Sequence, residues 1–131
     1  MTKMVLNLLY SREHEWILQM NKNQVRIGIS DYAQKQLGDI VFVEIPEVND
    51  KVTADESIGT IESVKTASEI YAPVSGTIIR VNEELQDAPE MINEQPYKAG
   101  WLVEIELSAP EELQGLLNEE EYQIFINEGG E

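Results

Sequence analysis

The stretch that decides the fold runs from residue 57 to residue 72 and reads Ser57, Ile58, Gly59, Thr60, Ile61, Glu62, Ser63, Val64, Lys65, Thr66, Ala67, Ser68, Glu69, Ile70, Tyr71, Ala72. Apolar residues recur at alternating positions on both sides of Lys65, which predicts two strands, residues 57–63 and 66–72. The two strands form a hairpin with Lys65 near its tip. The turn lacks the Asn-Gly or Asp-Gly pair of a primed two-residue turn, so the sequence leaves its geometry open.

Further strands are predicted on both sides of this hairpin. Pro73 and Gly76 end its second strand, and residues 77–81 begin another. Upstream, residues 15–20 and 24–29 read as two strands joined by a polar turn at 21–23. Gly28 and Gly59 each interrupt a strand, which indicates bends or bulges where a sheet curls over itself. This pattern favours a small flattened barrel or sandwich.

A short helix separates the upstream hairpin from the next strand. Ser30 and Asp31 offer an N-cap for a helix over residues 32–37, and Gly38 is predicted to end it in the left-handed conformation. The strand over residues 40–45 follows and is closed by Pro46.

The C-terminal part changes from strand to helix. Residues 100–107 read as a final strand. Ser108 with Glu111 forms a predicted capping box ahead of three leucines on one helical face, Leu113, Leu116 and Leu117. Asn118 with Glu121 repeats the box ahead of Tyr122, Phe125 and Ile126. We therefore predict one domain over residues 1–131, strand-rich at about 10–107 and helical at about 108–127.

Composition narrows the classes of function. The 131 residues carry a formal charge of −16, with 25 acidic and 9 basic side chains. Nucleic acid binding requires clustered Lys and Arg, so we expect none. The sequence has no apolar run of about 18 residues and no signal peptide, so we expect a cytoplasmic protein without a membrane span. Mutual repulsion favours a monomer that meets partners with basic surfaces.

The residue types needed for most catalytic and metal sites are missing. The chain has no cysteine and one histidine, His14, so thiolate chemistry, zinc clusters and His-based triads have little to build from. We expect His14 to pack or to pair with a carboxylate. No calcium loop or phosphate-binding glycine loop is present. An independent enzyme is the least favoured class of function.

Several motifs together resemble one family. They are Tyr10 to Trp16 (with His14-Glu15-Trp16), Leu37 to Pro46, Glu62-Ser63-Val64-Lys65, Ile70 to Gly76, Asn93 to Tyr97, and Gly100-Trp101. The chain resembles the H proteins of the glycine cleavage system, which are lipoyl carriers, over almost its entire length. The resemblance implies a mainly β fold, a flattened barrel-sandwich hybrid of the lipoyl-domain type with short helices, including a C-terminal helical segment.

The resemblance also implies a cofactor and its attachment point. Lys65 matches the lysine that carries lipoate through an amide bond, and Glu62, Ser63 and Val64 match the flank recognised at the lipoylation site. A biotin carrier would show Met-Lys-Met and a 2-oxoacid dehydrogenase lipoyl domain Asp-Lys-Ala; Val64 and Thr66 fit neither. A lipoate ligase or a lipoyl/octanoyl transferase would modify Lys65.

By resemblance, the chain is a carrier that catalyses nothing itself. The arm on Lys65 would take the aminomethyl group of glycine from a pyridoxal-phosphate glycine decarboxylase (P protein) and deliver it to a folate-dependent aminomethyltransferase (T protein). Dihydrolipoyl dehydrogenase (L protein) would then reoxidise the arm. The alternative is a lipoate relay or modification scaffold, in which Lys65 donates lipoate to other lipoyl domains. The His14-Glu15-Trp16 segment favours the shuttle.

In this family the loaded arm is described as folding back into a surface cleft. Glu15 matches the cleft carboxylate, and Glu69 falls where an acidic residue follows the lipoyl turn. A carboxylate stabilises a nearby ammonium group, which suits an aminomethyl cargo. Tyr32 stands where a histidine is common in the family and is our third expected cleft residue.

Overall fold

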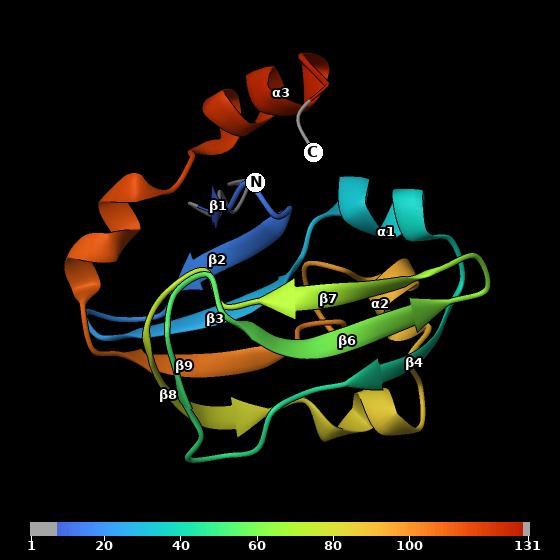
Figure 1. Ribbon diagram of the computed structural model, residues 1–131, viewed down its shortest axis with the longest axis horizontal. Helices are drawn as coiled ribbons and strands as arrows, with labels where there is room; N and C mark the ends of the chain where they lie inside the picture. Colours follow the sequence, from blue (N-terminus) through green and yellow to red (C-terminus); the bar gives the residue numbers. More distant parts are fainter. Residues whose placement is uncertain (1–7, 130–131) are drawn as a thin grey trace, which may run out of the picture.

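The computed structural model describes residues 8–129, which form two antiparallel sheets packed face to face (Figure 1). The larger sheet has six strands in the order β1 (Leu8–Tyr10), β2 (Glu15–Gln19), β3 (Gln24–Ile29), β9 (Val103–Leu107), β8 (Gly76–Val81) and β5 (Lys51–Val52). The smaller has three, in the order β4 (Ile40–Glu44), β6 (Ser57–Ser63) and β7 (Ala67–Tyr71). The arrangement is a non-closed sandwich, which confirms the predicted fold class.

Short helices surround the sandwich. They are α1 (Asp31–Leu37), α2 (Met91–Glu94) and α3 (Glu119–Asn127), with 3-10 turns η1 (Glu83–Gln86) and η2 (Pro110–Gly115). In Figure 1, α3 lies over β1 at one end of the larger sheet, and α1 lies at the end of the molecule that carries the β6–β7 tip. No helix among residues 8–129 is long and apolar enough to cross a membrane.

Aliphatic side chains fill the space between the sheets. The main core includes Ile17, Ile27, Ile61, Ile78 and Ile105, all nearly inaccessible to water. A second, mostly aromatic cluster contains Tyr10, Trp16, Trp101, Leu117 and Tyr122. Side chains alternate along β2, so Ile17 faces the main core and Trp16 faces this second cluster. The second cluster attaches α3 to the outside of the larger sheet.

Both predicted hairpins are present. Strands β2 and β3 pair antiparallel, as do β6 and β7, and the register of β6 with β7 shifts between Ser57 and Gly59. The shift confirms the predicted irregularity at Gly59. There, an added Cβ would collide with the Glu44 carbonyl oxygen.

The prediction of a bend at Gly28 was wrong. Trp16 pairs with Gly28 in a regular register, and the glycine is needed for space instead. A Cβ on Gly28 would lie 2.6 Å from three atoms of the Trp16 indole, whose Nε1 donates a 2.9 Å hydrogen bond to the Pro96 carbonyl.

Gly28→Ala is therefore expected to destabilise the protein by about 1–3 kcal/mol, because the methyl group overpacks a buried indole. Urea unfolding measures the change. Gly115→Ala is the matched control, since an added Cβ there meets nothing within 4 Å. Equal unfolding midpoints for the two variants would contradict the explanation.

Helix α1 follows the prediction at its start and differs at its end. The Ser30 hydroxyl accepts a hydrogen bond from the Ala33 amide, as expected of an N-cap. Gly38 has φ +81° and ψ −160°, an extended conformation reserved for glycine, rather than the predicted left-handed helical one. The chain therefore leaves α1 directly into β4.

The C-terminal helices were predicted correctly in one case of two. Asn118 and Glu121 form the reciprocal capping box at the start of α3. The box at Ser108 and Glu111 is absent, because η2 begins after Ala109 with no side-chain cap. Nor do the three leucines share a helical face: Leu116 is extended, and Leu117 exchanges two backbone hydrogen bonds with Tyr10. Pairing with β1 thus replaces helix at these residues.

Candidate functional site

Lys65 lies at the tip of the β6–β7 hairpin, and the Ser63 hydroxyl braces its backbone. This hydroxyl accepts hydrogen bonds from the amides of Lys65 and Thr66, each 3.1 Å, while the Ser63 amide donates to the Thr66 carbonyl at 2.7 Å. Neither Val64 nor Lys65 has positive φ, so the turn is not a primed one. The Val64 amide also donates to the Asp39 carbonyl at 2.9 Å, which ties the tip to the start of β4.

The Lys65 side chain is exposed but its stem has a fixed neighbour. A Cβ added to Gly38 would lie 3.2 Å from Lys65 Cδ, so the stem passes over the end of α1. Among residues 8–129, no carboxylate forms an ion pair with its ammonium group. The amine is thus open to chemistry, and the stem lies against the end of α1.

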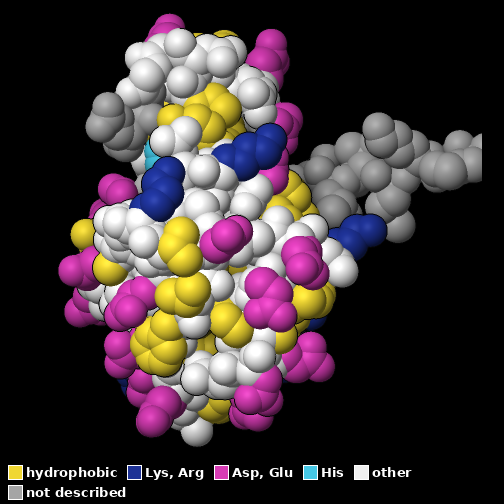
Figure 2. All heavy atoms as spheres, turned by 90° about the vertical axis from the view of Figure 1, so that its right-hand side faces the viewer, with side chains coloured by type: hydrophobic (Ala, Val, Ile, Leu, Met, Phe, Trp, Pro, Cys, Tyr) yellow, Lys and Arg dark blue, Asp and Glu magenta, His cyan; other side chains and the backbone are white. Residues whose placement is uncertain are grey.

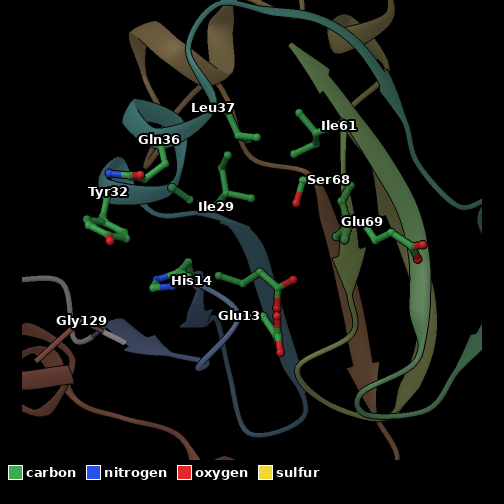
Figure 3. Close-up of a pocket in the computed structure, with 13 residues that line it drawn as sticks. Glu13, His14, Ile29, Tyr32, Gln36, Leu37, Ile61, Ser68, Glu69 and Gly129 are labelled. Atoms are coloured by element: carbon green, nitrogen blue, oxygen red, sulfur yellow. The ribbon is translucent and has the colours of Figure 1, made fainter. Parts of the chain in front are cut away.

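A cleft of about 430 Å³ lies beside α1 (Figure 3). Helix α1 forms one wall with Tyr32, Ala33, Gln36 and Leu37, and β7 forms the other with Ser68, Glu69 and Ile70. Leu37, which lines the cleft, precedes Gly38, the residue that the Lys65 stem approaches. The helix has seven residues, and at about 1.5 Å per residue it runs roughly 10 Å along the cleft.

The cleft brings together the three residues expected from the sequence, but not in the same way. Glu15 and Tyr32 both line it. Glu69 lines it as well, yet its carboxylate points away from His14 and Tyr32, while the neighbouring Ser68 points inward (Figure 3). The Glu69 carboxylate therefore lies on the outer face of the three-stranded sheet, as alternation with the buried Ile70 requires.

Glu15 is a buried acid with both carboxyl oxygens engaged. It is 2% exposed; Oε1 accepts from the Ser11 hydroxyl at 3.0 Å, and Oε2 accepts from the Tyr71 amide at 2.9 Å. Burial raises the pKa of Glu15 to about 8, although the hydrogen bonds from Tyr71 and Ser11 oppose the rise. The group thus connects β2 to β7 and holds a proton at neutral pH.

His14 lines the cleft and connects it to α3, a contact that sequence reasoning missed. The His14 Nδ1 and the Tyr122 hydroxyl share a 2.8 Å hydrogen bond, and the same hydroxyl lies 2.7 Å from the Ser30 Oγ. The ring of His14 lies 4.9 Å from that of Tyr32. Burial raises the pKa of Tyr122 to about 12, so the hydroxyl keeps its proton. The capping box at Asn118 predicted this helix, but no local signal showed where Tyr122 packs.

The cleft is partly apolar and has no basic side chain in its described lining. Within the described chain, its lining includes Glu13, Glu15 and Glu69 and no lysine or arginine, and Ile29, Leu37, Ile61 and Ile70 supply its apolar part. No group of three or more His, Cys, Asp or Glu side chains among residues 8–129 is placed to hold a metal ion. The described lining therefore offers apolar side chains and no basic group to a bound chain.

Comparison with known proteins gives the family. The family model described as Glycine cleavage H-protein matches residues 8–129. The chain belongs to this family. A glycine cleavage system H protein of Geobacillus thermodenitrificans is 54% identical over 122 residues, which cover 93% of this chain and 95% of the relative. Another, from Halalkalibacterium halodurans, is 52% identical over 128 residues, 98% of this chain and 99% of the relative.

A solved structure agrees at the level of the fold. The crystal structure of a glycine cleavage system H protein from Mycobacterium marinum superposes with a TM-score of 0.85 at 39% identity and covers 95% of this chain and 99% of that one. The family match extends from β1 through α3. The matched residues therefore include both the β6–β7 hairpin and α3.

Proposed function

We propose that this chain is the lipoyl carrier of the glycine cleavage system, with lipoate held in amide linkage to Lys65. The observation that carries the proposal is the position of Lys65: it is exposed on a hairpin tip held by Ser63, and its stem lies near Gly38, the residue after the cleft-lining Leu37. Family membership supports the metabolic system, and the exposed position of Lys65 supports it as the point of attachment.

A lysine on a fixed turn suits the attachment of a long arm. Its Nζ forms the amide, which removes the positive charge, and its flexible stem adds reach to the attached group. The lipoyl group supplies a disulfide that accepts the aminomethyl group of glycine. The protein contributes no thiol of its own, so no internal thiolate competes for that disulfide. The chain acts as a non-catalytic carrier.

Three enzymes complete the proposed cycle. A pyridoxal-phosphate glycine decarboxylase loads the arm, a folate-dependent aminomethyltransferase unloads it, and dihydrolipoyl dehydrogenase restores the disulfide. A lipoate ligase or lipoyl/octanoyl transferase attaches the arm beforehand. The carrier therefore meets several partners in turn, and strong binding to any one of them would slow the cycle.

Within the cleft we assign the recognition of the cationic cargo to Glu15, with Tyr32 on the facing wall. Burial raises the pKa of Glu15 to about 8. An ammonium group nearby favours the ionised form, because opposite charges attract strongly in a site with little water. A bound cationic cargo is therefore expected to lower the pKa of Glu15. The cleft supports the shuttle over the lipoate relay, which needs no place for an aminomethyl group.

The proposal is tested by reconstitution. The protein is produced with a lipoate ligase and free lipoate, and its intact mass and peptide map are measured. We expect one lipoyl amide, on Lys65, and carbon dioxide release from carboxyl-labelled glycine only when the modified carrier is added to the decarboxylase. An unmodified chain, under conditions that lipoylate a control lipoyl domain, would refute the attachment site. A modified but inactive carrier would refute the shuttle.

A further inference from the structure

A β-bulge on β4 exposes two apolar residues side by side. The register of β4 with β6 shifts between Ile40 and Phe42. Ile40 and Val43 are buried at 4% and 1%, whereas Val41 and Phe42 between them are 54% and 45% exposed. Regular alternation would bury Phe42; the bulge turns it outward with Val41. An edge strand that exposes two large apolar side chains to solvent indicates a surface that contacts a partner.

These residues adjoin the Lys65 turn. Phe42 pairs with Glu62 across the sheet, and Glu62 pairs with Ala67 at the start of β7. Val64 is 66% exposed beside Lys65, and its amide is bonded to the Asp39 carbonyl just before β4. Val41, Phe42 and Val64 thus form an apolar surface on one side of the hairpin tip, which we name the tip patch.

The tip patch has an acidic rim. Asp39, Glu44, Glu62 and Glu69 are exposed around it, and Lys65 is the only basic residue between Lys51 and Arg80. Figure 2, which views the end of the molecule carrying the hairpin tip, shows apolar side chains interspersed with many acidic ones, and Lys and Arg side chains in the upper part of this face. A complementary partner surface carries apolar side chains inside a basic rim.

We propose that the tip patch is the docking surface for the enzyme that attaches lipoate to Lys65. The inference rests on the proposed function. In the attachment step, the neutral Lys65 amine attacks the carbonyl carbon of an activated lipoyl group such as an acyl adenylate. A C–N bond forms, the bond from the carbonyl to the leaving group breaks, and the nitrogen gives up one proton.

The geometry favours this enzyme over those that use the loaded carrier. Its reacting carbon must come within about 3–3.5 Å of Nζ, so its surface must close over the residues beside the lysine. The decarboxylase, the transferase and the dehydrogenase act on the far end of the arm and have no such need. The tip patch therefore lies where the attaching enzyme must make contact, whereas the other three enzymes need not.

The test compares the rate of lipoylation of unmodified variants by a lipoate ligase. Phe42→Thr and Val64→Thr remove apolar surface and keep residues that suit a strand or turn. Each is expected to lower kcat/KM for lipoylation about tenfold, the effect of losing one well-packed interface residue. Val48→Thr, 46% exposed but on the loop after β4, is the control and should keep the normal rate. Raising the salt concentration should lower kcat/KM for the unaltered protein.

Thermal unfolding checks that each variant folds. If Phe42→Thr disturbs the bulge, Val64→Thr still tests the inference, because Val64 lies outside β4. Normal lipoylation of both variants would overturn the inference and leave the proposed function intact. Failure to lipoylate the unaltered protein would instead overturn the proposed function. Variants that are lipoylated normally but, once loaded, fail in glycine cleavage would assign the tip patch to another partner and also overturn the inference.

Discussion

The Lys65→Arg variant is expected to fold normally and to gain no lipoyl group. Lys65 is exposed and makes no ion pair among residues 8–129, so arginine keeps the charge and costs no packing. A guanidinium group stays protonated at physiological pH and offers no free amine for amide formation. Intact mass after incubation with ligase and lipoate measures the loss, and thermal unfolding measures the fold.

Lys98→Arg is the matched control, since Lys98 is an exposed lysine after α2. We expect that variant to be lipoylated fully. A lipoyl group on Lys65→Arg protein, at whatever residue, would show that the hairpin tip is not the site that the ligase selects.

Replacing Glu15 with glutamine is expected to remove a pH dependence from the stability of the protein. The pKa of Glu15 rises from 4.5 to about 8 on folding because the side chain is buried. A folded-state pKa above the unfolded one means that the native state binds the extra proton. The resulting stability is fully present below about pH 4.5 and is lost as the pH rises through about 8. Glutamine is neutral throughout, so the stability of Glu15→Gln relative to the unaltered protein should increase over that range.

Urea unfolding at a series of pH values, with the variant and the unaltered protein in the same buffers, measures this difference. Glutamine can still accept from the Tyr71 amide and bond to Ser11, whereas Glu15→Ala leaves the buried Tyr71 amide without its partner. We therefore expect Glu15→Ala to lose about 1–3 kcal/mol. Parallel pH curves for the glutamine variant and the unaltered protein would mean that Glu15 is ionised in the folded state.

The sequence was most informative where local pattern and tertiary packing coincide. The β6–β7 hairpin, the Ser30 cap of α1 and the Asn118 capping box follow from residues within a few positions of each other, and all three are present. The η2 region failed because a backbone pairing with Tyr10, more than a hundred residues away, takes Leu116 and Leu117 out of helix. No local rule includes such a partner.

The same limit applies to the candidate site. Lys65 could be identified from its isolation between two strands and from the family motif. The burial of Glu15 could not, because it depends on Ser11 and on the Tyr71 amide across the sandwich. Residues 40–43 are all apolar, so the sequence did not show which side chains of β4 face the core and which face solvent. Only the bulge decides that Phe42 faces out. The outward direction of Glu69 follows from the register of β7, which the sequence left open.

In the turn at Lys65, the residue that holds the backbone in place is different from the residues that a modifying enzyme would contact. A tight hairpin often depends on glycine or asparagine at its central positions, because the backbone there needs positive φ. Here the Ser63 hydroxyl closes the turn from outside, and the central positions keep ordinary conformations. The conformation of the turn consequently does not depend on the side chains of Val64, Lys65 and Thr66. The side chains that a modifying enzyme recognises can therefore be substituted at these positions without a change in the hairpin that presents them.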